Sequence, residues 1–275
     1  MTLVSALIFF LAAQRGQPPV PRTAQAAAPV DLTGYWVSVV SEDWRHRMAT
    51  PRKGDYESLP LSAEGRRAAD AWDLEKDNAA GLQCKAFGIG GIMRQPGRVH
   101  IAWQDENTLK VDFDAGAQTR LLNFDKSKQP PSDKTWQGFS VAEWEGPNVG
   151  GLGGLGRGAR GAEPDNSRQI EPGGGGRGLR GGPAPPGSIN QGGSLKVVTT
   201  RFREGYLRKN GAPYSANAQM TEYFDVVKEP NGDQWLVVKS IVVDPQYLQR
   251  SLIRSTHFRK QADATGWNPT PCAAR

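Results

Sequence analysis

The residue with the clearest potential for chemistry is Glu222, in the stretch QMTEYFDVV at 219–227. The stretch alternates like a β-strand, and Glu222 shares one face with Met220, Phe224 and Val226. A charged carboxylate among apolar side chains is costly unless it is paired. Burial that raises its pKa would suit it to general acid or base catalysis, and it could also orient a polar ligand group. The alternatives are an inward salt bridge or a face that meets solvent.

A candidate partner for Glu222 follows from the next turn, Asn231-Gly232, which is a strong signal for a two-residue hairpin loop. With this loop, Glu222 faces Ile241, and Lys239 lies diagonal to Glu222 on the same face. We therefore expect Lys239 to supply a polar contact beside Glu222. Arg254, from the following strand, is a second candidate partner.

The stretch TWQGFSVAEW at 135–144 predicts a wall of a ligand cavity. Two indoles and three small residues share one face of this strand: Trp136, Gly138, Ser140, Ala142 and Trp144. The alternative is close packing against a bulky neighbour such as Trp103 or Phe113. Ser140 comes close to a G-x-S-x-G nucleophile motif, but the alternation continues through it, which indicates an ordinary strand residue.

The sequence predicts neither a metal site nor a cofactor. No two of the three histidines, His46, His100 and His257, have a ligand spacing such as H-x-H or H-x-x-x-H. Gly151, Gly153 and Gly156 match G-x-G-x-x-G by letter, but no strand precedes them and no helix follows, so a dinucleotide site is excluded.

Composition indicates one globular domain, since the 275 residues are 37% hydrophobic and 23% charged. The net charge of +6 is spread along the chain, which favours a solubility role over nucleic-acid binding. Residues 146–193 hold more than half of the 33 glycines and predict a flexible insertion. Its Arg-Gly pairs leave open an alternative in which the chain acts as a surface interaction protein through this insertion.

The N-terminus predicts export. Residues 3–13 are almost wholly apolar but too few for a membrane span, which needs roughly 20 residues, and Ala24-Gln25-Ala26 offers a cleavage site. We expect a signal peptide at 1–26, a periplasmic or extracellular location and no stable membrane insertion. In an exported protein the two cysteines, Cys84 and Cys272, suggest a disulfide.

The remaining chain predicts an all-β fold. One helix is expected after Ser62, which caps AEGRRAADAW. Strands are expected at 34–41, 98–103, 108–113, 119–124, 135–144, 194–202, 219–227, 234–243 and 252–258. Short connections favour antiparallel neighbours, and closure removes exposed edges. We therefore expect an up-and-down barrel of eight or nine strands, formed by residues 27–145 and 194–275 around the insertion.

The stretch DLTGYW at 31–36 places Gly34-x-Trp36 at the start of the first strand and resembles the G-x-W motif of lipocalins and related calycin barrels. The resemblance implies that Trp36 plugs one barrel end and that an Arg of the last strand, Arg254 or Arg259, packs over it. The C-terminal half is similar to exported bacterial barrel proteins. The family binds small hydrophobic molecules, and some relatives are isomerases or hydratases.

Two hypotheses about the barrel follow. The first is an exported, lipocalin-like barrel that binds a small, largely apolar molecule, with Glu222 and Lys239 supplying polarity. The second is an enzyme on the same barrel, in which Glu222 performs proton transfer for isomerisation or hydration. The expected ligand-binding residues are Trp103, Phe113, Trp136, Ser140, Trp144, Phe224 and Lys239.

Overall fold

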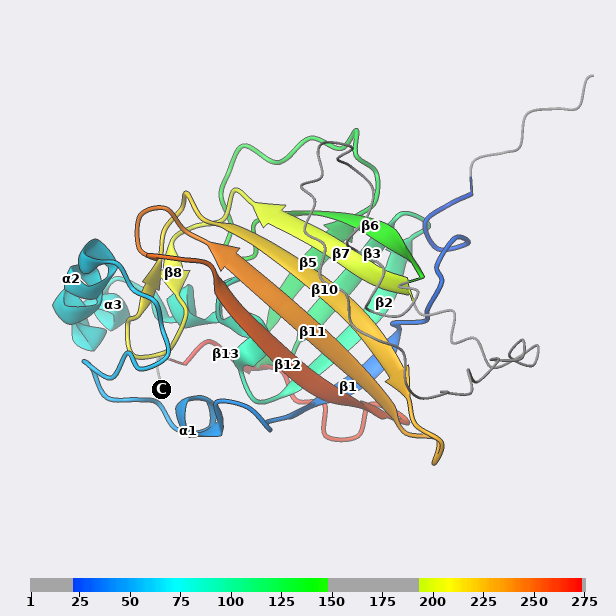
Figure 1. Ribbon diagram of the computed structural model, residues 1–275, viewed down its shortest axis with the longest axis horizontal. Helices are drawn as coiled ribbons and strands as arrows, with labels where there is room; N and C mark the ends of the chain where they lie inside the picture. Colours follow the sequence, from blue (N-terminus) through cyan, green and yellow to red (C-terminus); the bar gives the residue numbers. More distant parts are fainter. Residues whose placement is uncertain (1–21, 148–192, 274–275) are drawn as a thin grey trace, which may run out of the picture.

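Nine strands close into a barrel in the computed structural model, which describes residues 22–147 and 193–273 (Figure 1). The expected signal peptide and flexible insertion lie largely outside the described residues. Around the barrel the strands follow the order β1 (Gly34–Val39), β12 (Leu252–Gln261), β11 (Gln234–Val243), β10 (Gln219–Lys228), β7 (Gly193–Thr200), β6 (Phe139–Pro147), β5 (Gln118–Asn123), β3 (Thr108–Phe113) and β2 (Arg98–Asp105). The predicted all-β barrel is confirmed.

One pair of neighbouring barrel strands is parallel, whereas the sequence predicted antiparallel neighbours. Leu122 of β5 pairs with Ser140 of β6 in parallel, and the other pairs in the barrel are antiparallel. A closed ring with an odd number of strands cannot alternate direction throughout. Nine strands therefore require one parallel pair, which the connection between residues 123 and 139 provides.

The register of β10 and β11 differs by one residue from the prediction. Glu222 lies opposite Ser240, and Lys239 lies opposite Tyr223 on the outer face, where it is exposed. The loop spans residues 229–233 instead of Asn231-Gly232 alone, and it is closed by the Gly232 amide, which donates to the Glu229 carbonyl at 3.0 Å. Since strand side chains alternate, this slip of one residue moves Lys239 out of the barrel.

The register of β2 and β3 is confirmed, with Ile101 opposite Val111 and Val99 opposite Phe113. An irregularity between Trp103 and Asp105 takes up the odd residue of the turn.

Helical segments follow β1 and lie at one end of the barrel (Figure 1): α1 (Trp44–Met48), α2 (Ala63–Ala71), α3 (Leu74–Ala79), η1 (Gln83–Phe87) and η2 (Ile92–Arg94). The predicted helix is α2, and the Ser62 hydroxyl caps it by accepting from the Gly65 amide at 3.0 Å. Among the described residues, no helix has the length and apolar character needed to cross a membrane.

Residues 42–97 and 201–218 together form what we call the cap. The cap contains the helical segments above and a small sheet of β8 (Gly205–Tyr206) with β9 (Pro213–Tyr214). Its apolar side chains, such as Ile89, Leu207 and Tyr214, pack with Met220 and Leu252 at one end of the barrel. The cap also contributes Ala86, Phe87, Ile92 and Met93 to the core inside the barrel, so burial of apolar surface in both cores holds it in place.

Trp36 is fully buried at the opposite barrel end, as the lipocalin resemblance implies. Its indole nitrogen donates to the Leu32 carbonyl at 2.9 Å, and the Lys260 amine lies 5.0 Å from its ring centre. The cation over this Trp is therefore Lys260, and not Arg254 or Arg259. Both arginines are held elsewhere, Arg254 by Asp43 and Ser58 in the cap and Arg259 by Asp233.

Cys84 and Cys272 form the predicted disulfide, with a sequence separation of 188. The bond holds the C-terminal segment, where β13 (Thr270–Pro271) pairs in parallel with β4 (Ala115–Gly116). A disulfide is typical of an oxidising compartment, which agrees with the expectation of export.

Candidate functional site

Glu222 points into the barrel, where Arg120 of β5 is its ion-pair partner. Both side chains are buried, with exposed fractions of 0% for Glu222 and 1% for Arg120. The Arg120 guanidinium also donates to the Ser140 hydroxyl at 3.1 Å and to the Thr199 hydroxyl at 2.7 Å. This contact set corresponds to the inward salt bridge among the alternatives for Glu222, with Arg120 in place of Lys239.

The expected aromatic walls are not brought together around one cavity. Trp103 and Trp144 pack with Phe124 at ring distances of 5.1–6.5 Å, and the Trp144 indole donates to the Ala24 carbonyl at 2.9 Å. Phe113 and Phe224 are buried in the barrel core. Trp136 precedes β6, and the Arg203 guanidinium lies 3.9 Å from its ring centre. Close packing, the alternative interpretation of these aromatic residues, agrees with this arrangement.

A cleft of about 340 Å³ lies instead between the cap and the C-terminal segment. Among the described residues, its lining includes five basic side chains and no acidic one: His46, Arg47, Arg94, Arg208 and Lys209. Phe87, Leu207 and Pro271 contribute apolar surface to the same cleft. Such a volume suits a small molecule, and its lining suits one that carries negative charge.

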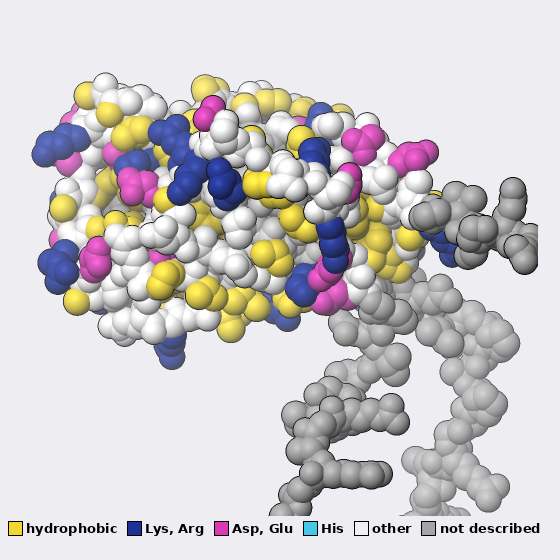
Figure 2. Space-filling model, turned by 90° about the horizontal axis from the view of Figure 1, so that it is seen from above, with side chains coloured by type: hydrophobic (Ala, Val, Ile, Leu, Met, Phe, Trp, Pro, Cys, Tyr) yellow, Lys and Arg dark blue, Asp and Glu magenta, His cyan; other side chains and the backbone are white. Residues whose placement is uncertain are grey.

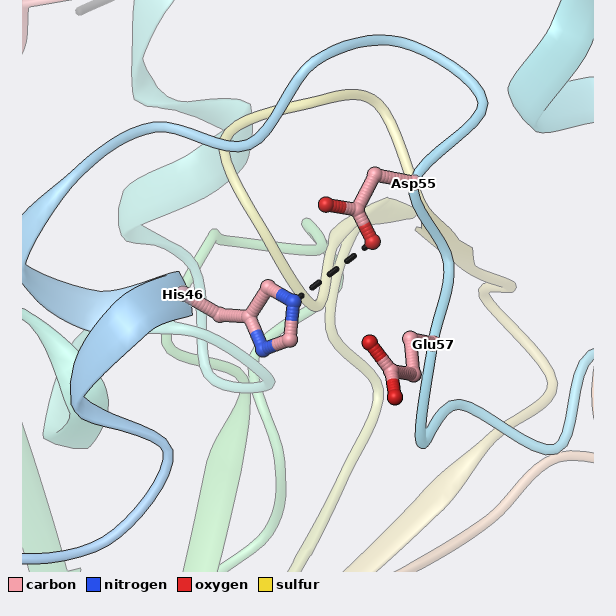
Figure 3. Close-up of side chains that lie close together, drawn as sticks. All are labelled: His46, Asp55 and Glu57. Atoms are coloured by element: carbon pink, nitrogen blue, oxygen red, sulfur yellow. Dashed lines mark ion pairs between the residues drawn. The ribbon is translucent and has the colours of Figure 1, made fainter.

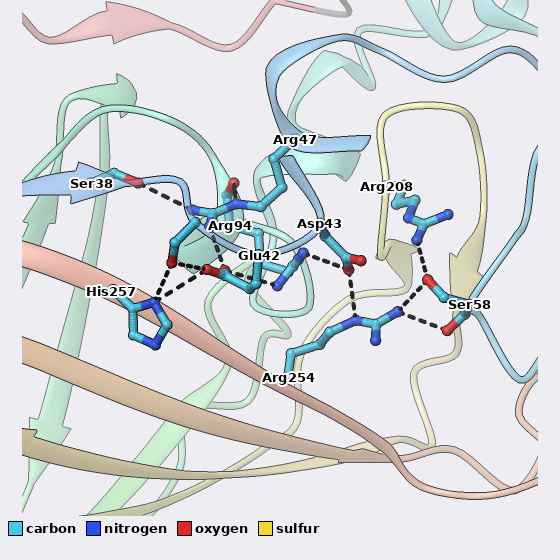
Figure 4. Close-up of polar contacts among 10 residues, drawn as sticks. Ser38, Glu42, Asp43, Arg47, Ser58, Arg94, Arg208, Arg254 and His257 are labelled. Carbon is cyan, nitrogen blue, oxygen red and sulfur yellow. Dashed lines mark hydrogen bonds and ion pairs between the residues drawn. The ribbon is translucent and has the colours of Figure 1, made fainter. Parts of the chain in front are cut away.

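Four buried or half-buried arginines lie beside this cleft, and three of them share two carboxylates (Figure 4). The Arg47 guanidinium pairs with Glu42, and Arg94 donates to Asp43 at 2.9 Å. Arg254 lies 3.4 Å from the same Asp43 oxygen. Arg208 is the fourth. Four guanidinium groups against two carboxylates leave two positive charges without a countercharge in this group.

Arg208 is the arginine with the weakest compensation. It is 7% exposed, and its side-chain hydrogen bond is to the uncharged Ser58 hydroxyl at 2.9 Å. Its Nη1 is buried and donates to no atom of the described chain. Burial lowers the pKa of Arg208 and the positive charge of Arg254 lowers it further, while the charges of Asp43, Asp55 and Glu57 oppose this shift in part. Binding of an anion stabilises a buried cation that has no ion-pair partner.

Arg94 has a similar environment. Its Nη1 is buried and forms no hydrogen bond within the described chain, although Glu42 lies 3.8 Å away. Burial lowers the pKa of Arg94 to about 10, with further contributions from the charges of Arg47 and Arg254. Arg94 therefore remains charged at neutral pH, and its buried Nη1 has no acceptor within the described chain.

Arg94, Arg208 and Leu207 also line a smaller cavity of about 20 Å³ on the barrel side of the cap. The other residues of this cavity are mainly apolar, including Leu59, Ile89, Met93, Met220, Val242 and Leu252. It has room for about one water molecule. Arg94 and Arg208 thus lie between the open cleft and this small cavity at the barrel end.

Lys209 completes the basic lining of the cleft. Its amine lies 4.9 Å from the ring centre of Phe87, and burial lowers the pKa of this amine. The turn that presents Arg208 and Lys209 is fixed locally, because the Leu207 amide donates to the Ala212 carbonyl at 2.7 Å. Gly211 has a φ of 81° there, and a Cβ at this position would overlap Trp72.

Sequence reasoning missed this cleft because its basic residues are distant in the chain. The clusters RHR at 45–47 and LRK at 207–209 were the available signals, yet the net charge alone indicated solubility. On the face in Figure 2, basic side chains lie beside acidic ones and form no continuous patch. Only the fold brings Arg47, Arg94 and Arg208 together.

In comparisons with known proteins, no family model, no curated protein and no solved structure matched the chain. Function is therefore inferred from the geometry of the cleft and from the sequence.

Proposed function

We propose that this protein is an exported, lipocalin-like binding protein that holds a small organic anion in the cleft beside the cap. The observation that carries the proposal is the buried Arg208 guanidinium, which lines the cleft and forms no ion pair with a carboxylate of the described residues. The ligand departs from the largely apolar molecule that the sequence predicted, because the cleft gathers five basic side chains.

A carboxylate with an apolar body fits this cleft best. Arginine forms charge-assisted hydrogen bonds with carboxylates, and Arg94 and Arg208 each have one buried Nη1 without an acceptor among the described residues. Phe87 and Leu207 offer apolar contact surface to the rest of the ligand. A compact aromatic carboxylate such as benzoate is therefore a suitable probe.

Export and the lipocalin-like family belong to this proposal. The apolar run at 3–13 and the disulfide between Cys84 and Cys272 support an exported protein. The closed barrel and the buried Trp36 after Gly34 are compatible with the lipocalin type.

The alternative enzyme function through Glu222 receives no support from the geometry. A general acid or base must come within hydrogen-bond reach of its substrate. The Glu222 carboxylate is fully buried against Arg120, and the basic cleft is lined by other residues.

Mass spectrometry of molecules that co-purify with the full chain tests the proposal. Native spectra should show a bound organic anion that is lost on denaturation and absent from an Arg208→Met variant. A bound neutral lipid, retained by that variant, would contradict it. Bound inorganic phosphate alone would confirm an anion site but not the organic carboxylate.

A further inference from the structure

We infer that His46, Asp55 and Glu57 form a binding site for a divalent metal ion of the zinc class (Figure 3). His46 also lines the basic cleft, whereas Asp55 and Glu57 do not. A metal ion held by these three residues would be a second ligand besides the proposed organic anion, so the inference goes beyond the proposed function.

The three side chains point toward one another from two separate segments (Figure 3). One ligand atom from each lies within 4.8 Å of those of the other two. His46 Nε2 and Asp55 Oδ1 are 3.5 Å apart. Ligand atoms around a tetrahedral zinc ion are roughly 3.4 Å apart, given bonds of about 2.1 Å. Small rotations of the two carboxylates would bring the three atoms to this spacing.

His46 supplies an independent observation that points to a ligand. Its side chain is 9% exposed, and its Nε2 is buried without a hydrogen bond to the described chain. The nitrogen faces the two carboxylates. A buried ring nitrogen without a hydrogen bond costs free energy, and a bound metal ion would satisfy it.

The segment that carries the carboxylates is fixed by Asn210, which is fully buried. The Asn210 amide donates to the Arg52 carbonyl at 3.1 Å and to the Asp55 carbonyl at 2.9 Å. The Asp55 amide donates to the Arg52 carbonyl at 3.0 Å, closing the turn in which Gly54 has a φ of 90°. Asp55 is therefore held opposite His46 before any metal binds.

The donor set favours zinc over magnesium or calcium. One imidazole and two carboxylates suit a borderline metal, whereas magnesium and calcium prefer oxygen ligands alone. The two carboxylates also balance the charge of a divalent ion. Three protein ligands leave a fourth position for water.

Arg45 is the competing cation at this site. Its guanidinium lies 3.8 Å from Asp55 and 4.0 Å from Glu57, while the side chain is 69% exposed. Ion pairs this long and exposed contribute little, so a metal ion could displace Arg45 into solvent. This competition gives the site a distinctive test.

The sequence prediction that no metal site exists considered only the spacing between histidines. The cluster contains one histidine, and its carboxylates come from residues nine and eleven positions later in the chain. A turn between His46 and Asp55 brings the histidine and the two carboxylates together. The spacing between histidines cannot predict such a turn.

Isothermal titration of the metal-stripped full chain with zinc chloride tests the inference. We expect one equivalent of zinc to bind, with affinity reduced about tenfold or more in His46→Gln and in Asp55→Asn. Arg45→Gln should instead raise the affinity, because it removes the competing cation. Magnesium should bind far more weakly than zinc.

His100→Gln is the matched control, because His100 lies 3.9 Å from a single carboxylate, Asp112, on the outer face of the barrel. Its zinc affinity should equal that of the unmodified chain. Absence of zinc binding in the unmodified chain would overturn the inference. Binding that His46→Gln and Asp55→Asn leave unchanged would do the same, and circular dichroism would show whether each variant is folded.

Discussion

Arg120 and Glu222 form an ion pair inside the barrel, and neither side chain is more than 1% exposed. Two hydroxyl groups, those of Ser140 and Thr199, accept hydrogen bonds from the same guanidinium. The acidic residue that first suggested catalysis is thus part of the barrel's internal polar network. In the structure it is the ion-pair partner of Arg120.

Replacing Glu222 by Leu should lower the free energy of unfolding by about 3–5 kcal/mol, because it leaves the Arg120 charge buried without a partner. Urea denaturation followed by circular dichroism measures this change. The double variant Arg120→Met/Glu222→Leu should recover part of the loss. Lys239→Ala, on the exposed outer face, should change the free energy by less than about 0.5 kcal/mol. A Glu222→Leu protein as stable as the unmodified chain would contradict this role.

The strands were predictable from alternation, but the partner of Glu222 was not. Alternation in RVHIAW and TLKVDF determines the register of β2 and β3, because any slip would oppose apolar to polar residues. In β11 the alternation does not decide the register. The predicted register, with Glu222 opposite Ile241, and the observed register, with Glu222 opposite Ser240, both place mainly apolar residues inside the barrel. The loop geometry decided the register, and loop length is poorly specified by Asn-Gly alone. Arg120 was missed because its partner strand is distant in sequence.

The basic cleft could not be predicted for a related reason. Its residues come from α1, η2, the 207–212 turn and the C-terminal segment, none of which has a strong periodic signal. Their positions depend on the packing of the cap against the barrel end. The sequence predicted the cysteine pair, but it did not predict that this disulfide holds the C-terminal segment beside the cleft.

Removing the disulfide should affect both stability and binding. The double variant Cys84→Ser/Cys272→Ser should lose about 2–5 kcal/mol of unfolding free energy, measured by urea denaturation. Thr270, Pro271 and Ala273 line the cleft beside this bond, so the benzoate affinity should also fall. Unchanged affinity in the folded double variant would show that the C-terminal segment does not need the bond to shape the cleft.

Deleting residues 148–190 should leave the barrel and the cleft intact. Pro147 and Gly193 are paired at the ends of β6 and β7, so a short Gly-Ser connection can close the hairpin. We expect the melting temperature and the benzoate affinity to match those of the full chain. Loss of ligand binding in a folded deletion variant would instead support a function of the glycine-rich insertion.

Alkaline pH should weaken benzoate binding. Burial lowers the pKa of Lys209 below the usual value for lysine and that of Arg94 to about 10. As the pH rises toward about 10, the basic groups of the cleft lose their protons at a lower pH than exposed lysine and arginine side chains do. Calorimetric titrations over this range should show a decreasing affinity for the unmodified chain. Lys209→Met should bind more weakly at neutral pH and show a smaller decrease.

The same pKa shift has the opposite effect on stability. Because the unfolded chain binds a proton at Lys209 more tightly than the folded chain, the stability contribution of Lys209 rises with pH between its folded and unfolded pKa values. The unmodified chain should therefore gain stability relative to Lys209→Met as the pH rises through this window. A constant difference in urea denaturation would show that the Lys209 pKa is unaffected by folding.

Calorimetric titration of the full chain with benzoate tests the anion-binding cleft most directly. Benzoate should bind with a stoichiometry of one, and benzamide, which has a similar shape but no charge, should bind far more weakly. Arg208→Met should lower the benzoate affinity by about tenfold or more, since a charge-assisted hydrogen bond contributes about 1.5–3 kcal/mol. Arg259→Met, an exposed arginine remote from the cleft, should bind benzoate normally. Equal affinities for benzoate and benzamide, or an Arg208→Met variant that binds as tightly as the unmodified chain, would contradict the proposed function.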